Sequence, residues 1–93
     1  MEFYSFKTGS GSTNKHVPVV TINDNKVIVE VGVEEHPMAE EHLIEWIAIE
    51  TTKGIQVAKL SHTEKPKAEF TLADGAEFIS AYENCNLHGL WKK

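Results

Sequence analysis

The chain contains five histidines and one cysteine among its 93 residues, and their spacing suits metal binding. Cys85 and His88 are close enough in sequence for a thiolate and an imidazole to bind the same ion, and this donor pair suits iron, copper or zinc. The pair alone is weak evidence, because a single cysteine is often simply a small buried side chain. His16, His36 and His42 would add three more imidazole nitrogens.

Together these side chains offer four nitrogen donors and one sulfur donor. A structural zinc ion needs only four ligands, whereas a redox-active iron ion with one open coordination position fits five donors better. The single cysteine excludes a disulfide within the chain, a four-cysteine zinc ribbon and an iron–sulfur cluster.

A scaffold must bring these distant residues together, and the sequence pattern predicts β-strands. The predicted strands are rich in β-branched or alternating apolar residues and cover 17–22, 26–31, 42–52, 55–60, 67–72 and 77–82. The segment 42–52 could form a helix, but its β-branched end favours a strand buried on both faces, with Ile44 and Ile47 on opposite faces. Six or more short strands indicate an antiparallel sandwich or barrel. Cys85 and His88 are then expected in a loop after the last strand.

The rest of the composition narrows the class of protein. Residues 1–14 are expected to be an N-terminal segment with a flexible Gly/Ser loop, followed by a single domain at 15–93. A net charge of -5 and the absence of arginine argue against a nucleic-acid partner. No apolar run approaches the roughly 20 residues that span a bilayer, and no secretory signal is visible, so we expect a cytoplasmic protein with no membrane partner.

Four sequence blocks carry a resemblance to a known family. They are KHVP at 15–18, EHPM at 35–38, EHLIEWI at 41–47 and CNLHGLW at 85–91. In order and spacing the chain resembles superoxide reductase, the family of neelaredoxin and of the C-terminal iron domain of desulfoferrodoxin. The resemblance implies an all-β, immunoglobulin-like sandwich of about seven strands. With only one cysteine, the chain is expected to be the one-iron form.

The resemblance also implies a cofactor and a reaction. The family binds one mononuclear non-haem iron per chain, with four histidine nitrogens in a plane and a cysteine sulfur on the axis. The matching positions are His16, His36, His42, His88 and Cys85. The reaction is the one-electron reduction of superoxide to hydrogen peroxide, without production of oxygen. His62 belongs to no family motif and is expected to be an ordinary surface residue.

Further expectations follow from the same resemblance. Lys15 matches a family lysine that steers superoxide and helps to supply protons, and is expected to be catalytic. Many relatives have glutamate at the position of Asn14, where it binds the oxidised iron. An amide is a poorer ligand for ferric iron, so water, hydroxide or an exogenous anion is expected there instead. The expected electron donor is rubredoxin or a similar protein, and the chain is expected to form a dimer or a tetramer.

Two other classes of function stay open on the sequence. Cupredoxins are electron-transfer copper proteins that also combine a β-sandwich with histidine and cysteine ligands, but they place a methionine shortly after the last histidine. No methionine follows His88 here. The other alternative is an immunoglobulin-like binding module in which the histidines bind no metal.

Overall fold

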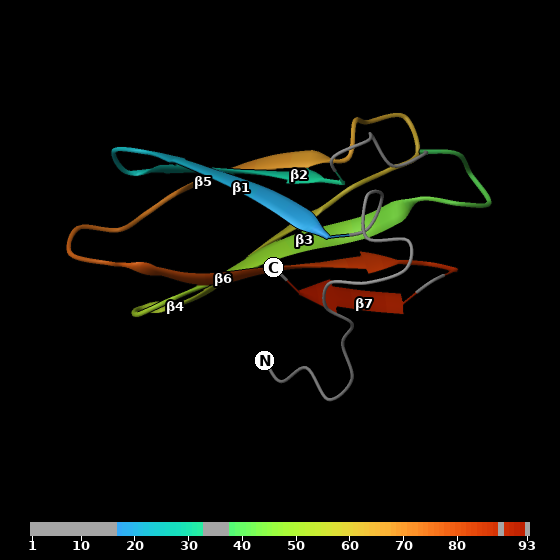
Figure 1. Ribbon diagram of the computed structural model, residues 1–93. Coiled ribbons are helices and arrows are strands. Elements are labelled where there is room, and N and C mark those ends of the chain that lie inside the picture. The colour runs from blue at the N-terminus through green and yellow to red at the C-terminus, as the bar shows by residue number, and fades with distance from the viewer. Residues whose placement is uncertain (1–16, 33–37, 88, 93) are drawn as a thin grey trace.

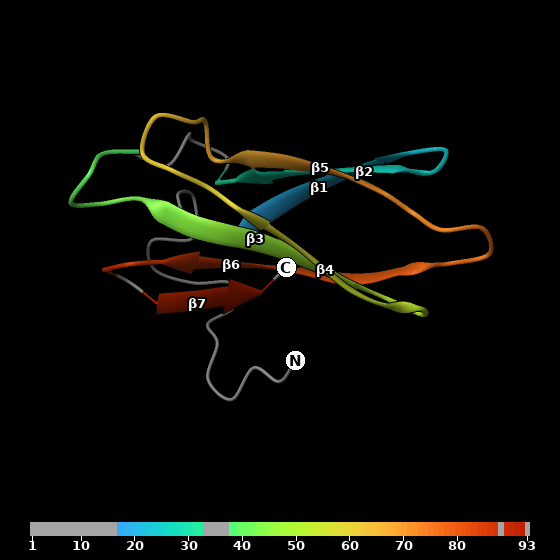
Figure 2. The same ribbon diagram turned by 180° about the vertical axis from the view of Figure 1, so that it is seen from behind.

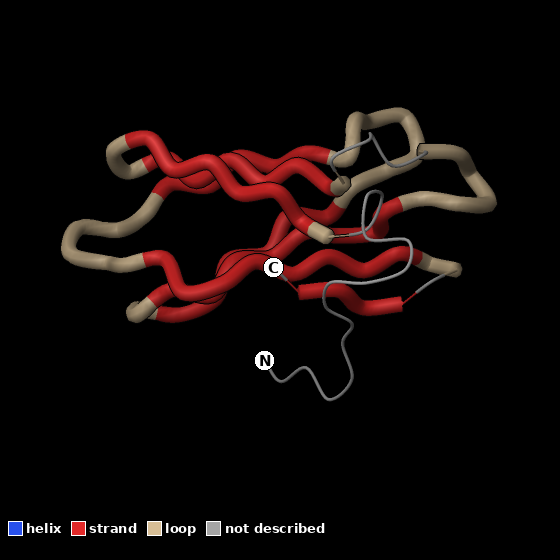
Figure 3. The backbone as a smooth tube through the Cα atoms, viewed as in Figure 1, coloured by secondary structure: helices blue, strands red, loops and turns tan. Residues whose placement is uncertain are grey.

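The computed structural model describes residues 17–32, 38–87 and 89–92, which form seven β-strands and no helix (Figure 1 and Figure 3). The strands are β1 (Pro18–Asn23), β2 (Lys26–Val31), β3 (Ile44–Thr51), β4 (Gly54–Lys59), β5 (Lys67–Thr71), β6 (Phe78–Cys85) and β7 (Gly89–Lys92). Nothing in these described segments is a helix of the length and apolarity that crossing a membrane requires.

The strands form two antiparallel sheets. The three-stranded sheet has the order β1-β2-β5, and the four-stranded sheet has the order β4-β3-β6-β7. The two sheets lie face to face as separate layers in Figure 1, and Figure 2 shows the same two layers from behind. The prediction of an all-β, immunoglobulin-like antiparallel sandwich is therefore confirmed.

The core lies between the two layers and is built from the inner faces of four strands. Val27, Val29 and Val31 share one face of β2, as predicted, and at most 1% of each is exposed. The other buried members of this cluster are Ile44, Ile47, Ile49, Ala68, Phe70, Ala81 and Cys85. Because Cys85 belongs to this cluster, the apolar core itself extends to one of the predicted metal ligands.

An irregularity in β3 changes which of its side chains face the core. The segment is a strand and not a helix, but Ile44 and Ile47 are both fully buried in the same cluster instead of lying on opposite faces. The register with β6 shifts between them, because Ile44 pairs with Cys85 while Trp46 pairs with Asn84. The additional residue in β3 is a bulge, which reverses the alternation of side chains on one side of it.

The C-terminal strands also differ from the prediction. Strand β6 continues to Cys85 instead of ending near Tyr82, and β7 follows it, so the expectation that Cys85 lies in a loop after the last strand was wrong. The polar pair Glu83 and Asn84 interrupts the apolar pattern, but the backbone there pairs with β3 on one side and with β7 on the other. Gly89 begins β7 with a φ of 84°, a conformation that favours glycine.

Candidate metal centre

The two predicted ligands that the structure describes lie at the same end of the sandwich. His42 is separated from the start of β3 by Leu43, Cys85 ends β6, and these two strands are neighbours in the four-stranded sheet. Figure 1 and Figure 2 both place the segment before β3 and the turn after β6 at the end opposite the β5–β6 connection. The fold therefore brings together the two backbone segments that carry this imidazole and this thiol, although they are far apart in sequence.

Cys85 is fixed by the sheet on both sides. Only 1% of its surface is exposed, and its backbone pairs with Ile44 on β3 and with Gly89 on β7. A cysteine at the end of a central strand is held more rigidly than one in a loop, and its burial limits access of water to the sulfur. Both properties suit a thiolate that must bind a metal ion in one orientation.

His42 lies in a short, well-bonded turn. The backbone N–H of Ala39 donates to the carbonyl oxygen of His42 at 2.9 Å, and the N–H of His42 donates to the carbonyl oxygen of Ala39 at 3.1 Å. The ring is half-buried, and its Nε2 atom is buried. These two hydrogen bonds therefore hold the backbone of His42 in place without the help of a metal ion.

Asn86 connects the His42 segment to the end of β6. Its Oδ1 accepts a hydrogen bond from the Leu43 N–H at 3.0 Å, and its Nδ2 donates to the Glu41 carbonyl oxygen at 3.1 Å. In addition, the Asn86 N–H donates to the Leu43 carbonyl oxygen at 3.2 Å. The sequence placed this asparagine inside a motif without assigning a role to its side chain.

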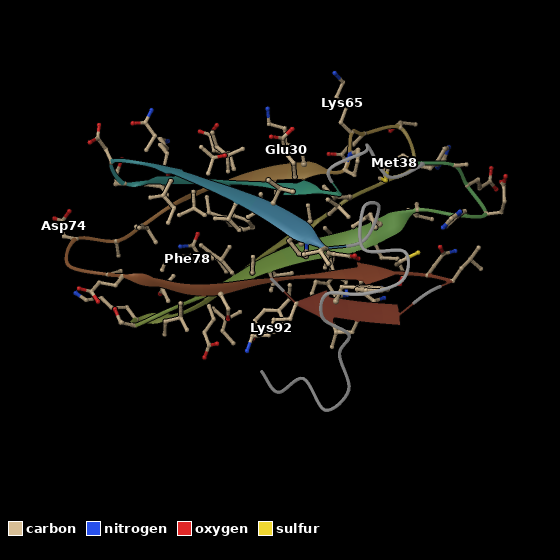
Figure 4. The ribbon with its side chains drawn as sticks, viewed as in Figure 1. Glu30, Met38, Lys65, Asp74, Phe78 and Lys92 are labelled. Carbon is tan, nitrogen blue, oxygen red and sulfur yellow. The ribbon has the colours of Figure 1, made fainter. Side chains whose placement is uncertain are left out.

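Met38 provides a second connection in the same region. Its Sδ accepts a hydrogen bond from the backbone N–H of Ile44 at 3.3 Å, and its side chain packs against the apolar core. In Figure 4 Met38 lies toward one end of the sandwich and Asp74, in the β5–β6 connection, lies at the other. Ile44 is the residue that pairs with Cys85, so Met38 contacts the backbone directly beside the predicted thiolate ligand.

Glu83 is a buried carboxyl group that the sequence interpretation missed. It lies two residues before Cys85 on β6, pairs with Trp91 on β7, and is 0% exposed. Burial raises the pKa of Glu83 from 4.5 to about 9, so the group is neutral at pH 7. The sequence pattern could have revealed this burial. If the predicted strand is continued to Cys85, every second residue from Ala81 faces the core, and this places Glu83 on the core face.

The remaining predicted site residues stay predictions. They lie outside the described residues and are Asn14, Lys15, His16, His36 and His88. Among the described ranges alone, no three His, Cys, Asp or Glu side chains form a group that could hold a metal ion. His62 is exposed in the connection between β4 and β5.

The described donors fit a metal centre of the predicted kind. An imidazole with a buried Nε2 and a buried thiol are presented by neighbouring backbone segments, which are joined through Asn86. A thiolate and an imidazole are suitable ligands for iron. His42 and Cys85 therefore fit as two of the five predicted ligands.

Comparison with known proteins places the whole chain in one family. A desulfoferrodoxin family profile matches residues 8–93. A desulfoferrodoxin homolog of Archaeoglobus fulgidus is 41% identical over 92 residues, which is 99% of this chain and 72% of that protein. The superoxide reductase of Thermococcus kodakarensis is 35% identical over an alignment of 107 residues, with 95% of this chain and 91% of the relative covered.

A solved structure gives the same result. The crystal structure of the superoxide reductase from Treponema pallidum superposes with a TM-score of 0.89 at 39% sequence identity, and the match covers 96% of this chain and 74% of that one. Sequence and fold thus agree over nearly the full length of the chain. The chain belongs to the desulfoferrodoxin family and, with its relatives named superoxide reductase, is an oxidoreductase.

Proposed function

We propose that this enzyme reduces superoxide to hydrogen peroxide at a single iron ion held by His16, His36, His42, His88 and Cys85. The reaction takes one electron and two protons for each superoxide and releases one hydrogen peroxide and no oxygen. The observation that supports the proposal is that the His42 segment lies beside the end of β6: Ile44 pairs with Cys85, and the Asn86 side chain bonds to Leu43 and Glu41.

Each described residue has a definite task in this proposal. Iron bound at this site would supply the electron. Cys85 would bind it as a buried thiolate, and the sheet would keep the sulfur in one position. His42 would bind through its buried Nε2 atom. Glu83, whose pKa is raised to about 9 by burial, stays uncharged at pH 7 and adds no negative charge beside a site with an anionic substrate.

Lys15 is the proposed catalytic residue within the domain at 15–93. Its positive charge would attract superoxide on a chain whose net charge is -5, and it would help to deliver protons to the reduced substrate. The proposed electron donor is rubredoxin or a similar small one-electron carrier in the cytoplasm. We further propose that the chain forms a dimer or a tetramer.

The test is to measure metal content and reaction products on one sample. Purified protein is loaded with iron, reduced without oxygen, and mixed with superoxide while hydrogen peroxide and oxygen are quantified. We expect one iron per chain, one hydrogen peroxide per superoxide and no oxygen. Dismutation would instead give one hydrogen peroxide and one oxygen for every two superoxide ions, and this result would contradict the proposal.

A cysteine variant tests the ligand assignment in the same assay. Cys85→Ser should lose the thiolate-to-iron absorption and the reduction of superoxide, because a neutral hydroxyl is a far weaker donor than a thiolate. Superoxide reduction at the original rate by this variant would refute the role of Cys85. Copper, and not iron, as the metal retained by the wild-type protein would favour a cupredoxin-like function instead.

A further inference from the structure

Asn86 bonds to both neighbours of His42 and is itself the residue after Cys85. The Leu43 N–H donates to Oδ1 of Asn86 at 3.0 Å, and Nδ2 of Asn86 donates to the Glu41 carbonyl oxygen at 3.1 Å. The two hydrogen bonds join positions 43 and 45 residues apart in sequence. The side-chain amide of Asn86 therefore bonds to the residues on both sides of His42, while its backbone directly follows Cys85.

The geometry of an amide explains why two bonds matter more than one. The oxygen and the nitrogen of Asn86 lie in one rigid plane, so bonding both of them fixes the His42 segment at two points. A single bond would leave this segment able to rotate about the contact. The side chain is exposed, so water competes for each bond, and the backbone bond from the Asn86 N–H to the Leu43 carbonyl oxygen at 3.2 Å supports the pair.

We propose that Asn86 is a positioning residue of the metal centre, holding His42 in a fixed place relative to Cys85 without binding the metal ion itself. The proposal rests on the proposed function for the identity of the ion as iron. Residues that hold metal ligands in place typically change metal affinity by about 10- to 100-fold when they are replaced. Iron retention, rather than activity, is therefore the property that Asn86 should control.

Two variants separate the two bonds of the side chain. Asn86→Ala removes both bonds, whereas Asn86→Asp keeps an acceptor for the Leu43 N–H but cannot donate to the Glu41 carbonyl oxygen. In metal-free protein, amide hydrogen exchange at Leu43 should be about tenfold faster in N86A than in wild type, as expected for the loss of one hydrogen bond. Exchange at Leu43 in N86D should stay close to the wild-type rate.

The same variants are then loaded with iron and challenged with a chelator. N86A should release iron about 10- to 100-fold faster than wild type, and N86D should fall between the two. The thiolate-to-iron absorption band should shift in N86A, because a displaced His42 changes the ligand field at the metal. If N86A does not fold, N86D is used for the test. We then expect N86D to release iron faster than wild type while its Leu43 amide stays protected from exchange.

Asn84, near the end of β6, offers a matched control. Its Nδ2 donates to Oε1 of Glu45 at 2.7 Å, so Asn84→Ala also removes a long-range side-chain hydrogen bond between the same two regions. Although Asn84 precedes Cys85, its side-chain bond ends on Glu45 and not on either neighbour of His42. N84A should therefore release iron within about twofold of the wild-type rate, even if its stability falls by the typical contribution of one hydrogen bond.

Three results would decide the matter. Iron release and an absorption band in N86A equal to those of N84A would overturn the positioning role, and so would unchanged Leu43 exchange in N86A. The expected changes in exchange and iron release, combined with a wild-type protein that does not reduce superoxide, would contradict the proposed function while supporting the role of Asn86.

Discussion

Glu83 on β6 lies directly opposite Trp91 on β7, and both side chains are buried, with 0% and 5% of their surfaces exposed. A carboxyl group in this position is neutral near pH 7, because burial raises its pKa from 4.5 to about 9. In the unfolded chain the same group would be ionised at pH 7. The folded state therefore binds one more proton than the unfolded state between these two pKa values.

The stability of the metal-free protein should consequently depend on pH through Glu83. A group whose pKa is raised on folding stabilises the folded state fully below its unfolded pKa of 4.5, and this contribution is lost as the pH rises to about 9. Glu83→Gln removes the titration, so the free energy of unfolding of this variant should fall less between pH 5 and pH 9 than that of wild type. Urea denaturation of metal-free samples at several pH values measures the difference, with exposed Glu77→Gln as the control. Parallel pH profiles for wild type and E83Q would contradict the expectation.

His42 and His62 should respond differently to the same substitution. His42→Gln removes a predicted ligand with a buried Nε2, so the variant should retain much less iron and reduce superoxide more slowly. His62→Gln changes an exposed side chain in the β4–β5 connection and should leave both properties close to wild type. Iron content after gel filtration and the rate of superoxide consumption provide the two measurements. Equal iron loss in both variants would remove the support for His42 as a ligand.

The Met38 sulfur should protect the backbone next to Cys85. Met38→Leu keeps a similar apolar volume but removes the acceptor for the Ile44 N–H, so we expect a loss of stability below about 1.5 kcal/mol together with faster exchange of the Ile44 amide. Met38→Ala should cost more stability, because it also leaves a gap against the core. Unchanged Ile44 exchange in M38L would show that the sulfur does not hold this amide in solution.

Packing between the sheets should dominate the stability of the domain. Ile47 is 0% exposed in the core, so Ile47→Ala should reduce the free energy of unfolding by about 2–5 kcal/mol. Ile79 on the neighbouring strand β6 is 54% exposed, and Ile79→Ala should change the same quantity by no more than about 0.5 kcal/mol. Urea denaturation of the metal-free proteins tests both values. Similar losses in the two variants would mean that Ile47 is not a core residue in solution.

The sequence predicted the scaffold where local patterns control the structure. Strand β2 was predicted with the observed bounds because Val27, Val29 and Val31 alternate with less buried residues between two clear turn signals. The bulge in β3 could not be predicted, because it depends on the pairing of Ile44 with Cys85 across the sheet. A bulge is a property of two strands, and no single segment encodes it.

In the candidate site, too, local sequence patterns could be predicted and contacts between distant segments could not. His42 and Cys85 were predicted from motifs, whereas the hydrogen bonds of Asn86 join residues more than forty positions apart and leave no local pattern. Glu83 was missed because a charged residue near a strand end is usually exposed. It lies opposite Trp91 on β7, a strand of four residues that was itself not predicted as a separate element.

The register between β6 and β7 has a consequence for the order of folding events. Cys85 pairs with Gly89, so the β6–β7 pairing depends only on contacts that are close in sequence and can form within microseconds. The contact between Asn86 and the His42 segment has to close a loop of more than forty residues, which costs chain entropy and slows its formation. We therefore expect a newly made chain to form first the β6–β7 pairing that includes Cys85 and to bring His42 beside it only when the β3–β4 hairpin docks. High-affinity metal uptake would then report on the later step.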